Sequence, residues 1–317
     1  MRRATRIDKK LATALLACAI AIAAMAPAAL ARVHRARCLP ADPHSPSCLV
    51  WTGKVTFVDD GDTVDVKIDG ARKRRVRVTG INTNELTRYS HKAGKRRGAC
   101  HAVAATNQLE RMIKKSHWRV RLLAQHASSH SGHGRIRRSL QVRIGGRWRD
   151  PGAEQLRTGL ALWLPNGQER AWNQSYSDIA KRAAARHVGM YNGSSCGRGP
   201  AADAQLRVHV NWDAAGDDHS NVNGEWIEVH NLGPRPVRVG RWHVKDSDLK
   251  YYALPRWATV PAHGSIYVHV GRGLSHGTSF YWGFGHALFD NTIGDGGYLF
   301  DPRGNLRAWD IYTPSWR

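Results

Sequence analysis

The chain of 317 residues is poor in acidic side chains and in cysteine. It has 25 Asp and Glu residues against 48 Lys and Arg, a formal net charge of +23 at pH 7. None of its five cysteines shows Cys-x-x-Cys spacing, which argues against the common structural zinc sites. No internal repeat appears. With 42% apolar and 23% charged residues the composition is ordinary for a globular protein, which excludes wholesale disorder and a collagen-like fibre.

The first 31 residues have the features of a secretory signal peptide. Basic side chains come first, an apolar run follows from Leu11 to Leu30, and the segment ends in Ala29-Leu30-Ala31. A transmembrane anchor is the alternative, but the run is mostly alanine and contains Pro27. Lipoprotein processing at Cys18, which would tether the product to a membrane, is a minor alternative. We therefore expect a secreted protein with no transmembrane span in its mature form.

The remaining positive charge lies in one half of the chain. Residues 32–200 hold 32 Lys and Arg against 12 Asp and Glu, whereas residues 201–317 hold 11 against 12. Two halves that differ this much predict two domains with separate roles. Turn-forming residues collect at 197–202, where we place the boundary.

Four cysteines follow the signal segment, all of them in the basic half: Cys38, Cys48, Cys100 and Cys196. An even number of cysteines in an exported chain predicts two disulfides. Three connectivities are possible. We favour Cys38–Cys48 as a local clip, with Cys100–Cys196 joining the end of the domain to an internal helix.

Short strands open the basic half. A strand at 54–58 leads into an acidic turn, and apolar residues alternate with polar ones over 64–68, as in a half-buried strand. Asp69-Gly70 signals a hairpin. Further strands are predicted at 75–78, 118–123 and 140–144, and helices at 99–115 and 172–188. About five strands with helices between and after them indicate a small OB-type barrel.

Groups suited to phosphate chemistry gather where these strands meet. An Asp-Gly-Asp-Thr turn contains Asp62, Arg77 lies on a following strand, and Asn82, Thr83 and Glu85 come next. Oxygens of Asp62, Asn82 and the Thr83 carbonyl suit a hard cation such as calcium. A guanidinium on the same surface can bind a phosphate, and a free carboxylate beside it can take a proton from water. Together these groups predict a phosphodiesterase site.

This order of residues resembles the staphylococcal (micrococcal) nuclease family. The family pattern is Asp-Gly-Asp-Thr, a strand arginine and then Asp-Thr-Pro-Glu, where this chain has Asn-Thr-Asn-Glu at 82–85. Gly134-Arg135 falls at the family's second active-site arginine. Residues 161–166 resemble its aromatic-Pro-Asn segment, and residues 189–191 resemble the end of its closing helix. The likeness covers about residues 50–196 and implies an OB-fold barrel with helices.

The resemblance implies binding roles for five residues. Asp62 would be the main carboxylate ligand of Ca²⁺, with Asn82 and the Thr83 carbonyl completing the set. Trp163 would stack on a nucleoside, and His133 stands where the family has another substrate-binding tyrosine.

It also implies the catalytic groups and the reaction. Glu85 would be the general base that activates water, while Arg77 and Arg135 would stabilise charge on the transition state. Members of the family cut DNA and RNA and leave 3′-phosphate ends.

Two departures from the family pattern bear on activity. Asn82 stands where the family has an aspartate, so calcium affinity should fall with ligand charge. Asn84 replaces the proline before Glu85, and we expect this to loosen the loop that aims the base. We therefore expect an active enzyme with a weaker metal requirement.

Basic clusters at 72–75, 95–97 and 135–149 create a field that attracts polyphosphate and releases counterions. Such salt-sensitive binding suits a nonspecific nuclease on DNA or RNA, and equally a cell-wall polyanion or an acidic lipid surface. His126, His130 and His133 are spaced like metal ligands, but a flexible polar loop is the simpler interpretation.

The last 117 residues have a different composition. They contain 7 of the 12 Trp, 6 of the 9 Tyr and 4 of the 5 Phe residues. Alternating stretches at 206–210, 226–229, 237–239 and 266–270 predict an all-β sandwich. Residues 223–231 and 237–244, with 289–291 and 296–304, resemble the lamin-tail domain, an immunoglobulin-like fold, over about 204–317. The resemblance implies a binding or positioning module, with a cell-envelope ligand as one candidate, and no catalytic role.

The sequence therefore predicts a secreted, calcium-dependent, sugar-nonspecific endonuclease with an appended β-sandwich. One alternative is a nucleic-acid-binding barrel whose decayed site is marked by Asn82 and Asn84. Another is a surface adhesin in which the sandwich has the main role. The joint presence of Asp62, Arg77 and Glu85 favours the enzyme.

Overall fold

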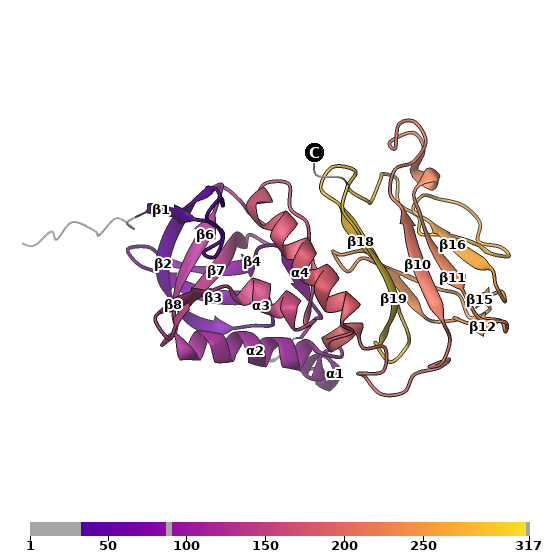
Figure 1. Ribbon diagram of the computed structural model, residues 1–317, viewed down its shortest axis with the longest axis horizontal. Coiled ribbons are helices and arrows are strands. Elements are labelled where there is room, and N and C mark those ends of the chain that lie inside the picture. Colours follow the sequence, from indigo (N-terminus) through magenta and orange to yellow (C-terminus); the bar gives the residue numbers. More distant parts are fainter. Residues whose placement is uncertain (1–32, 87–90, 315–317) are drawn as a thin grey trace, which may run out of the picture.

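The computed structural model describes residues 33–86 and 91–314 (Figure 1). The signal peptide predicted for residues 1–31, including Cys18, lies outside the described residues. The basic half and the aromatic-rich half lie side by side, with helix α4 next to strands β18 and β19 (Figure 1).

Five strands of the N-terminal half form a mixed β-barrel with helices, compatible with an OB-fold. They are β2 (Ser47–Val58), β3 (Thr63–Ile68), β4 (Lys73–Val78), β6 (Arg119–Ala124) and β7 (Ile136–Ile144). Their order is β2-β3-β4-β7-β6, and β2 pairs again with β6 to close the barrel. Strands β4 and β7 run parallel. A register shift between Val55 and Phe57 interrupts the ladder of the long β2 with β3, and β2 pairs in addition with β1 and β6.

Four shorter strands extend this framework. Strand β1 (His34–Arg37) pairs with β2, and β8 (Arg147–Arg149) forms a hairpin with β7. Outside the barrel, β5 (Ile81–Thr83) pairs with β9 (Ala161–Trp163). This last ladder fixes the segment in which Asn82 and Thr83 lie.

Helices cover the barrel. They are α1 (Ala93–Arg97), α2 (Ala102–Lys115), α3 (Pro151–Arg157) and α4 (Asn173–Ala185), with 3₁₀ turns η1 (Arg170–Trp172) and η2 (Gly189–Tyr191). The two predicted helices are present, although α2 begins three residues later than expected. Helix α3 was not predicted. Asp150 begins it, because its carboxylate accepts a 3.1 Å bond from Ala153 N and Pro151 occupies the first turn.

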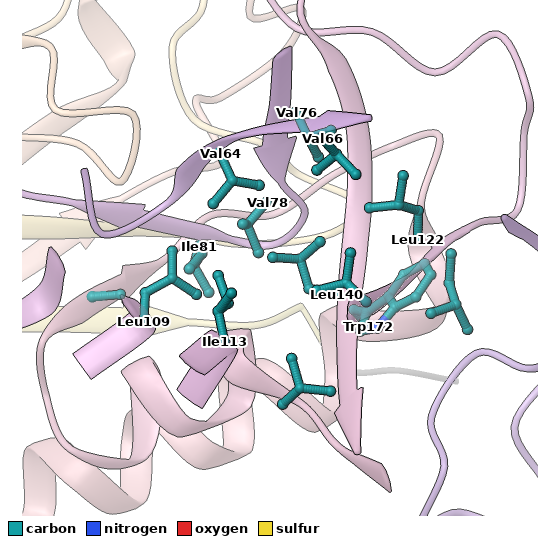
Figure 2. Packing of buried hydrophobic residues seen from close by; sticks show 14 of the residues in the cluster. Val64, Val66, Val76, Val78, Ile81, Leu109, Ile113, Leu122, Leu140 and Trp172 are labelled. Carbon is teal, nitrogen blue, oxygen red and sulfur yellow. The ribbon is translucent and has the colours of Figure 1, made fainter. Parts of the chain in front are cut away.

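The barrel core consists of alternating residues from the strands and one face of α2 (Figure 2). Val64 and Val66 of β3 belong to one cluster with Leu122 and Leu140, and Leu109 of α2 lies beside Ile81 in the same cluster. The period-two pattern that predicted these strands is thus the pattern of core-facing side chains.

The disulfides join Cys38 to Cys48 and Cys100 to Cys196, which confirms the favoured pairing. Such bonds are typical of an oxidising, extracellular environment. Among the described residues, no helix is long and apolar enough to cross a membrane.

The C-terminal region is mostly β and consists of several small sheets. One contains β10 (Leu206–Asn211), β11 (Trp226–Asn231), β16 (Ser265–His269) and β17 (Ser279–Tyr281). Another contains β13 (His243–Lys245), β14 (Tyr251–Ala253), β18 (Asp295–Phe300) and β19 (Leu306–Tyr312). A two-stranded sheet pairs β12 (Val237–Arg238) with β15 (Thr259–Val260), and a 3₁₀ turn, η3 (Val222–Gly224), precedes β11. Strands therefore form in all four segments expected from alternation.

The two halves share an apolar cluster. Leu162, Met190 and Tyr191 of the first half are buried in it together with Tyr298 and Phe300 of the second. The ring of Trp309 lies edge-on to that of Tyr191, with centroids 5.1 Å apart. The C-terminal region is therefore packed against the barrel half rather than merely tethered to it.

Candidate active site

The Asp-Gly-Asp-Thr turn between β2 and β3 is held in place by its neighbours. Gln155 of α3 donates a 2.9 Å bond to the carbonyl oxygen of Gly61. A Cβ atom on Gly61 would lie 2.6 Å from the Cβ of Ala105 and 2.9 Å from Thr83 Oγ1, so this position accepts only glycine without displacement. The tight fit fixes the direction of the Asp62 side chain.

Asp62 is fully buried and its carboxylate is saturated with donors. One oxygen accepts bonds from Thr83 N at 2.7 Å and Thr83 Oγ1 at 3.0 Å. The other accepts from Thr63 Oγ1 at 3.0 Å and from the Arg77 guanidinium. The antiparallel register of β3 and β4 places Thr63 opposite Arg77, which brings the arginine to the turn.

Arg77 also contacts Asn82. Its guanidinium, in a residue that is 8% exposed, donates to Asp62 through one terminal nitrogen and to Asn82 Oδ1 through the other. Three of the predicted site residues therefore meet at a single point. The Asn82 amide nitrogen donates a 3.0 Å bond to the carbonyl oxygen of Ser247, in the C-terminal region.

Glu85 is exposed and lies near enough to this cluster for the charges of Asp62 and Arg77 to act on it. Its backbone carbonyl accepts a 3.1 Å bond from Ala99 N. Partial burial, and after it the charge of Asp62, raises the pKa of Glu85, while Arg77 and Arg135 oppose that shift. A carboxylate with a raised pKa is better suited to accept a proton near neutral pH.

Asn84, which we expected to loosen the loop before Glu85, is itself held by a hydrogen bond. Asn84 is 6% exposed, and its Nδ2 donates a 2.7 Å bond to the carbonyl oxygen of Cys100. The side chain thus ties the loop to the Cys100–Cys196 disulfide. A hydrogen bond takes the place of the conformational restriction that a proline would supply.

Arginines 135, 137 and 138 separate into two groups. Arg135 is half-buried and its Nε donates 3.1 Å to Gly132 O. Arg137 lies directly beside Arg77 in the parallel β4–β7 ladder, and burial together with the charges of Arg77 and Arg135 lowers its pKa. Arg138 instead donates to backbone carbonyls and stacks 4.6 Å over Trp51. Sequence reasoning missed Arg137, which the pairing of the two strands places next to Arg77.

The nucleoside-stacking role expected for Trp163 does not agree with its position. Trp163 is 0% exposed and belongs to the barrel core, because strand β9 pairs with β5 and buries its side chain. A base cannot reach this ring without displacing the core. His133 is exposed on the turn before β7, with a φ of 61°, so its side chain is accessible.

Asp60, the first residue of the acidic turn motif, is a further site group. Its carboxylate accepts a 3.0 Å bond from Asp62 N. Burial, and after it the charge of Asp62, raises the pKa of Asp60 to about 8. The sequence already pointed to Asp60 as a site residue, since the Asp-Gly-Asp-Thr turn contains two aspartates.

The oxygens of Asp62 and Asn82 are of the kind that a hard cation such as Ca²⁺ binds. In this structure they accept from the Arg77 guanidinium, so a cation held by both would have to displace that contact. Asp62, Asn82 and Thr83 are all almost fully buried, and Thr83 contacts Asp62 through its N–H and hydroxyl groups. The neutral Asn82 oxygen contributes less charge than a carboxylate would.

A second group of potential ligands lies at the disulfide. Atoms of Cys100, His101 and Cys196 come within 4.8 Å of one another. The two sulfur atoms are bonded to each other, so they are not thiolate ligands in this state.

No family model matches this chain. A search of curated proteins likewise finds no match.

Proposed function

We propose that this protein is a secreted, calcium-dependent nuclease of the staphylococcal nuclease type that hydrolyses phosphodiester bonds in DNA and RNA. The observation that carries the proposal is the meeting of Asp62, Arg77 and Asn82, with Glu85 close enough for its pKa to respond to both charges. A protein that only binds nucleic acid through surface arginines would not need a buried carboxylate, a guanidinium and a loop glutamate at one place.

The residues suggest the following reaction. Glu85 accepts a proton from a water molecule, which attacks the phosphorus atom. The bond from phosphorus to the 5′ oxygen breaks and that oxygen takes a proton from solvent water, which leaves a 3′-phosphate and a 5′-hydroxyl end. Arg77 and Arg135 bind phosphate oxygens whose negative charge grows in the transition state. A bound Ca²⁺ would supply Lewis-acid stabilisation of the same phosphate, held by Asp62, Asn82 and Thr83.

A basic hairpin supports a polyanionic substrate. On β6 and the β7–β8 hairpin, the guanidinium of Arg121 lies 3.7 Å from the ring centroid of Trp148. Burial, and after it the charge of Arg143, lowers the pKa of Arg121. Arg147 and Arg149 project from the same hairpin and are exposed. Exposed arginines around an aromatic ring are typical of surfaces that bind nucleic-acid strands.

The further parts of the proposal concern the whole chain. The N-terminal segment would direct secretion, in agreement with two disulfides. The C-terminal region would be an immunoglobulin-like module of the lamin-tail type, with a cell-envelope ligand as a candidate partner.

A nucleic-acid-binding protein without catalysis is the second candidate function. It is favoured by the burial of Asp62 and by its saturation with donors, since a bound cation would have to replace the Arg77 contact. The basic surface would serve this function equally well.

One experiment separates the two candidates. The mature chain, residues 32–317, is incubated with single-stranded DNA, double-stranded DNA and RNA, in calcium or in a chelator, beside the variant Glu85→Gln. Glu154→Gln, at a half-buried carboxylate of α3 that is paired with Arg157, is the matched control. Calcium-dependent cleavage that Glu85→Gln loses by about 10²-fold or more and the control retains supports the enzyme. A gel shift without cleavage in either buffer supports the binding protein.

A further inference from the structure

We propose that the loop at residues 246–250 of the C-terminal region is a positioning element of the candidate active site, acting through Asn82. This inference rests on the proposed nuclease function for its kinetic consequences. The observation behind it is the bond from Asn82 Nδ2 to Ser247 O, which joins residues 165 positions apart.

The loop connects β13 to β14 and is held from within its own sheet. Ser247 N donates 3.3 Å to Oδ1 of the buried Asp295, on β18. Asp246 is 1% exposed and accepts a 2.8 Å bond from Lys250 N. Both contacts fix the direction of the Ser247 carbonyl, and therefore the place where the Asn82 amide must lie.

The chemistry of Asn82 matches this arrangement. Its Oδ1 accepts from Arg77, while its Nδ2 donates to Ser247. An aspartate could serve Arg77 but, when ionised, has no proton to donate, and its second oxygen would face the Ser247 carbonyl oxygen. The asparagine at this position is therefore the residue that a site completed by the C-terminal region requires.

An acidic residue of the same loop, Asp248, also interacts electrostatically with Arg137. The carboxylate of Asp248 acts on Arg137 and opposes the lowering of its pKa by burial and by the charges of Arg77 and Arg135. Asp248 is partly exposed and also lies 3.4 Å from Lys250 Nζ. The loop thus contributes negative charge beside a strongly cationic strand.

Contacts elsewhere hold the two halves in one arrangement. Asn305 Oδ1 accepts a 2.8 Å bond from Cys196 N, and Lys181 Nζ donates 2.7 Å to Thr313 Oγ1. With the shared apolar cluster, these contacts give the Ser247 carbonyl a fixed position relative to β5. A small displacement of Asn82 would then misplace a ligand oxygen and Arg77 together.

The test uses the full mature chain and variants of the loop. Asp246→Ala removes the acceptor for Lys250 N, whereas Asp246→Asn keeps an oxygen there. Asp217→Ala, in an exposed loop of the same region, is the matched control. Hydrogen exchange of residues 81–86, calorimetric calcium binding, kcat and KM are measured for each chain, and thermal melting verifies folding.

We expect Asp246→Ala to speed exchange in residues 81–86 and to lower kcat by about ten- to a hundredfold. KM should stay within about twofold, because the basic surface that binds the polyanion is unchanged. Asp246→Asn should restore the exchange rate of residues 81–86 and kcat. The control should match the unaltered protein. If Asp246→Ala only destabilised the fold, the melting temperature would fall, and kcat would not decrease selectively while KM stayed the same.

Asn82→Asp gives a second arm that leaves the loop unaltered. We expect faster exchange in residues 246–250 and no gain in calcium affinity, despite the added ligand charge. Tighter calcium binding with unchanged exchange would overturn the proposal, and so would an Asp246→Ala protein that keeps kcat. If the unaltered chain cleaves nothing while both exchange effects appear, the nuclease function fails and the positioning of Asn82 by the loop stands.

Discussion

Asn84 donates a 2.7 Å hydrogen bond to the carbonyl oxygen of Cys100, the cysteine that is joined to Cys196. The residue immediately before the proposed base is thus fixed to a covalent crosslink. The loop that carries Glu85 is therefore connected through Cys100 to Cys196, 96 residues further along the chain.

This link predicts different effects for the two disulfides. Replacing Cys100 and Cys196 by alanine should lower stability by about 2–4 kcal/mol and lower kcat about tenfold or more, since the loop at Asn84 loses its support. The matched control replaces Cys38 and Cys48, which should cost stability without this loss of kcat in the folded fraction. Urea titration and single-turnover cleavage measure both quantities. Equal kcat in the two double variants would contradict the link.

Gly61→Ala should damage the site through sterics alone. The added Cβ would lie 2.6 Å from Ala105 Cβ and 2.9 Å from Thr83 Oγ1, so the turn or its neighbours must move. Overpacking of this kind costs about 1–3 kcal/mol, and the displaced Asp62 should weaken calcium binding. Gly132→Ala, where a Cβ meets nothing within 4 Å, is the control. Calorimetry and urea unfolding report the two effects, and an unchanged calcium affinity in Gly61→Ala would refute them.

The sequence predicted most of the barrel because its strands have one buried face. Alternation over 64–68 and the hairpin signal at Asp69-Gly70 are local features, and local features suffice for such strands. Helix α3 is only seven residues long, too short for a periodic pattern, although Asp150-Pro151 at its start was a usable signal.

Three members of the candidate site could be predicted from the sequence, but their contacts and the place of Trp163 could not. Asp62, Arg77 and Asn82 lie close in sequence and meet through one hairpin and one short ladder. The burial of Trp163 depends on the pairing of two three-residue strands, which no local pattern encodes. The contact of Asn82 with Ser247 depends on the packing of two halves and is equally invisible in local sequence.

Arg137 should contribute to cleavage, because it lies directly beside Arg77 in the β4–β7 ladder. We expect Arg135→Ala and Arg137→Ala each to lower kcat/KM by about tenfold or more, because both remove positive charge near the scissile phosphate. Arg138→Ala is the control from the same strand, since Arg138 binds carbonyls and stacks on Trp51. It should lower the melting temperature and leave the rate per folded molecule unchanged. A normal rate in Arg137→Ala would show that the neighbouring charge is without effect.

The basic hairpin should determine the salt dependence of binding. Replacing Arg143 and Arg147 by alanine should reduce the slope of log K against log salt, by about 0.9 for each phosphate of double-stranded DNA that the protein no longer neutralises. Arg157→Ala is the control, because that arginine is already paired with Glu154. Fluorescence anisotropy at several salt concentrations, in a chelator, measures the slope. Identical slopes for the unaltered protein, the double variant and the control would place the binding surface elsewhere.

Asp150 predicts how stability changes with pH. Its carboxyl group lies at the start of α3, where both of its oxygens are 2.9 Å from the Tyr176 hydroxyl that donates to it, and burial raises its pKa to about 6 from 3.8. Because the folded chain holds this proton more tightly, the contribution of Asp150 to stability is complete below about pH 4 and is lost as the pH rises through about 6. Asp150→Asn keeps an acceptor for Ala153 N and cannot ionise. The difference in unfolding free energy, wild type minus variant, should therefore grow by about 2 kcal/mol as the pH falls from 7 to 4. Urea titrations across this range test it, and a constant difference would mean that Asp150 titrates alike in the folded and unfolded chains.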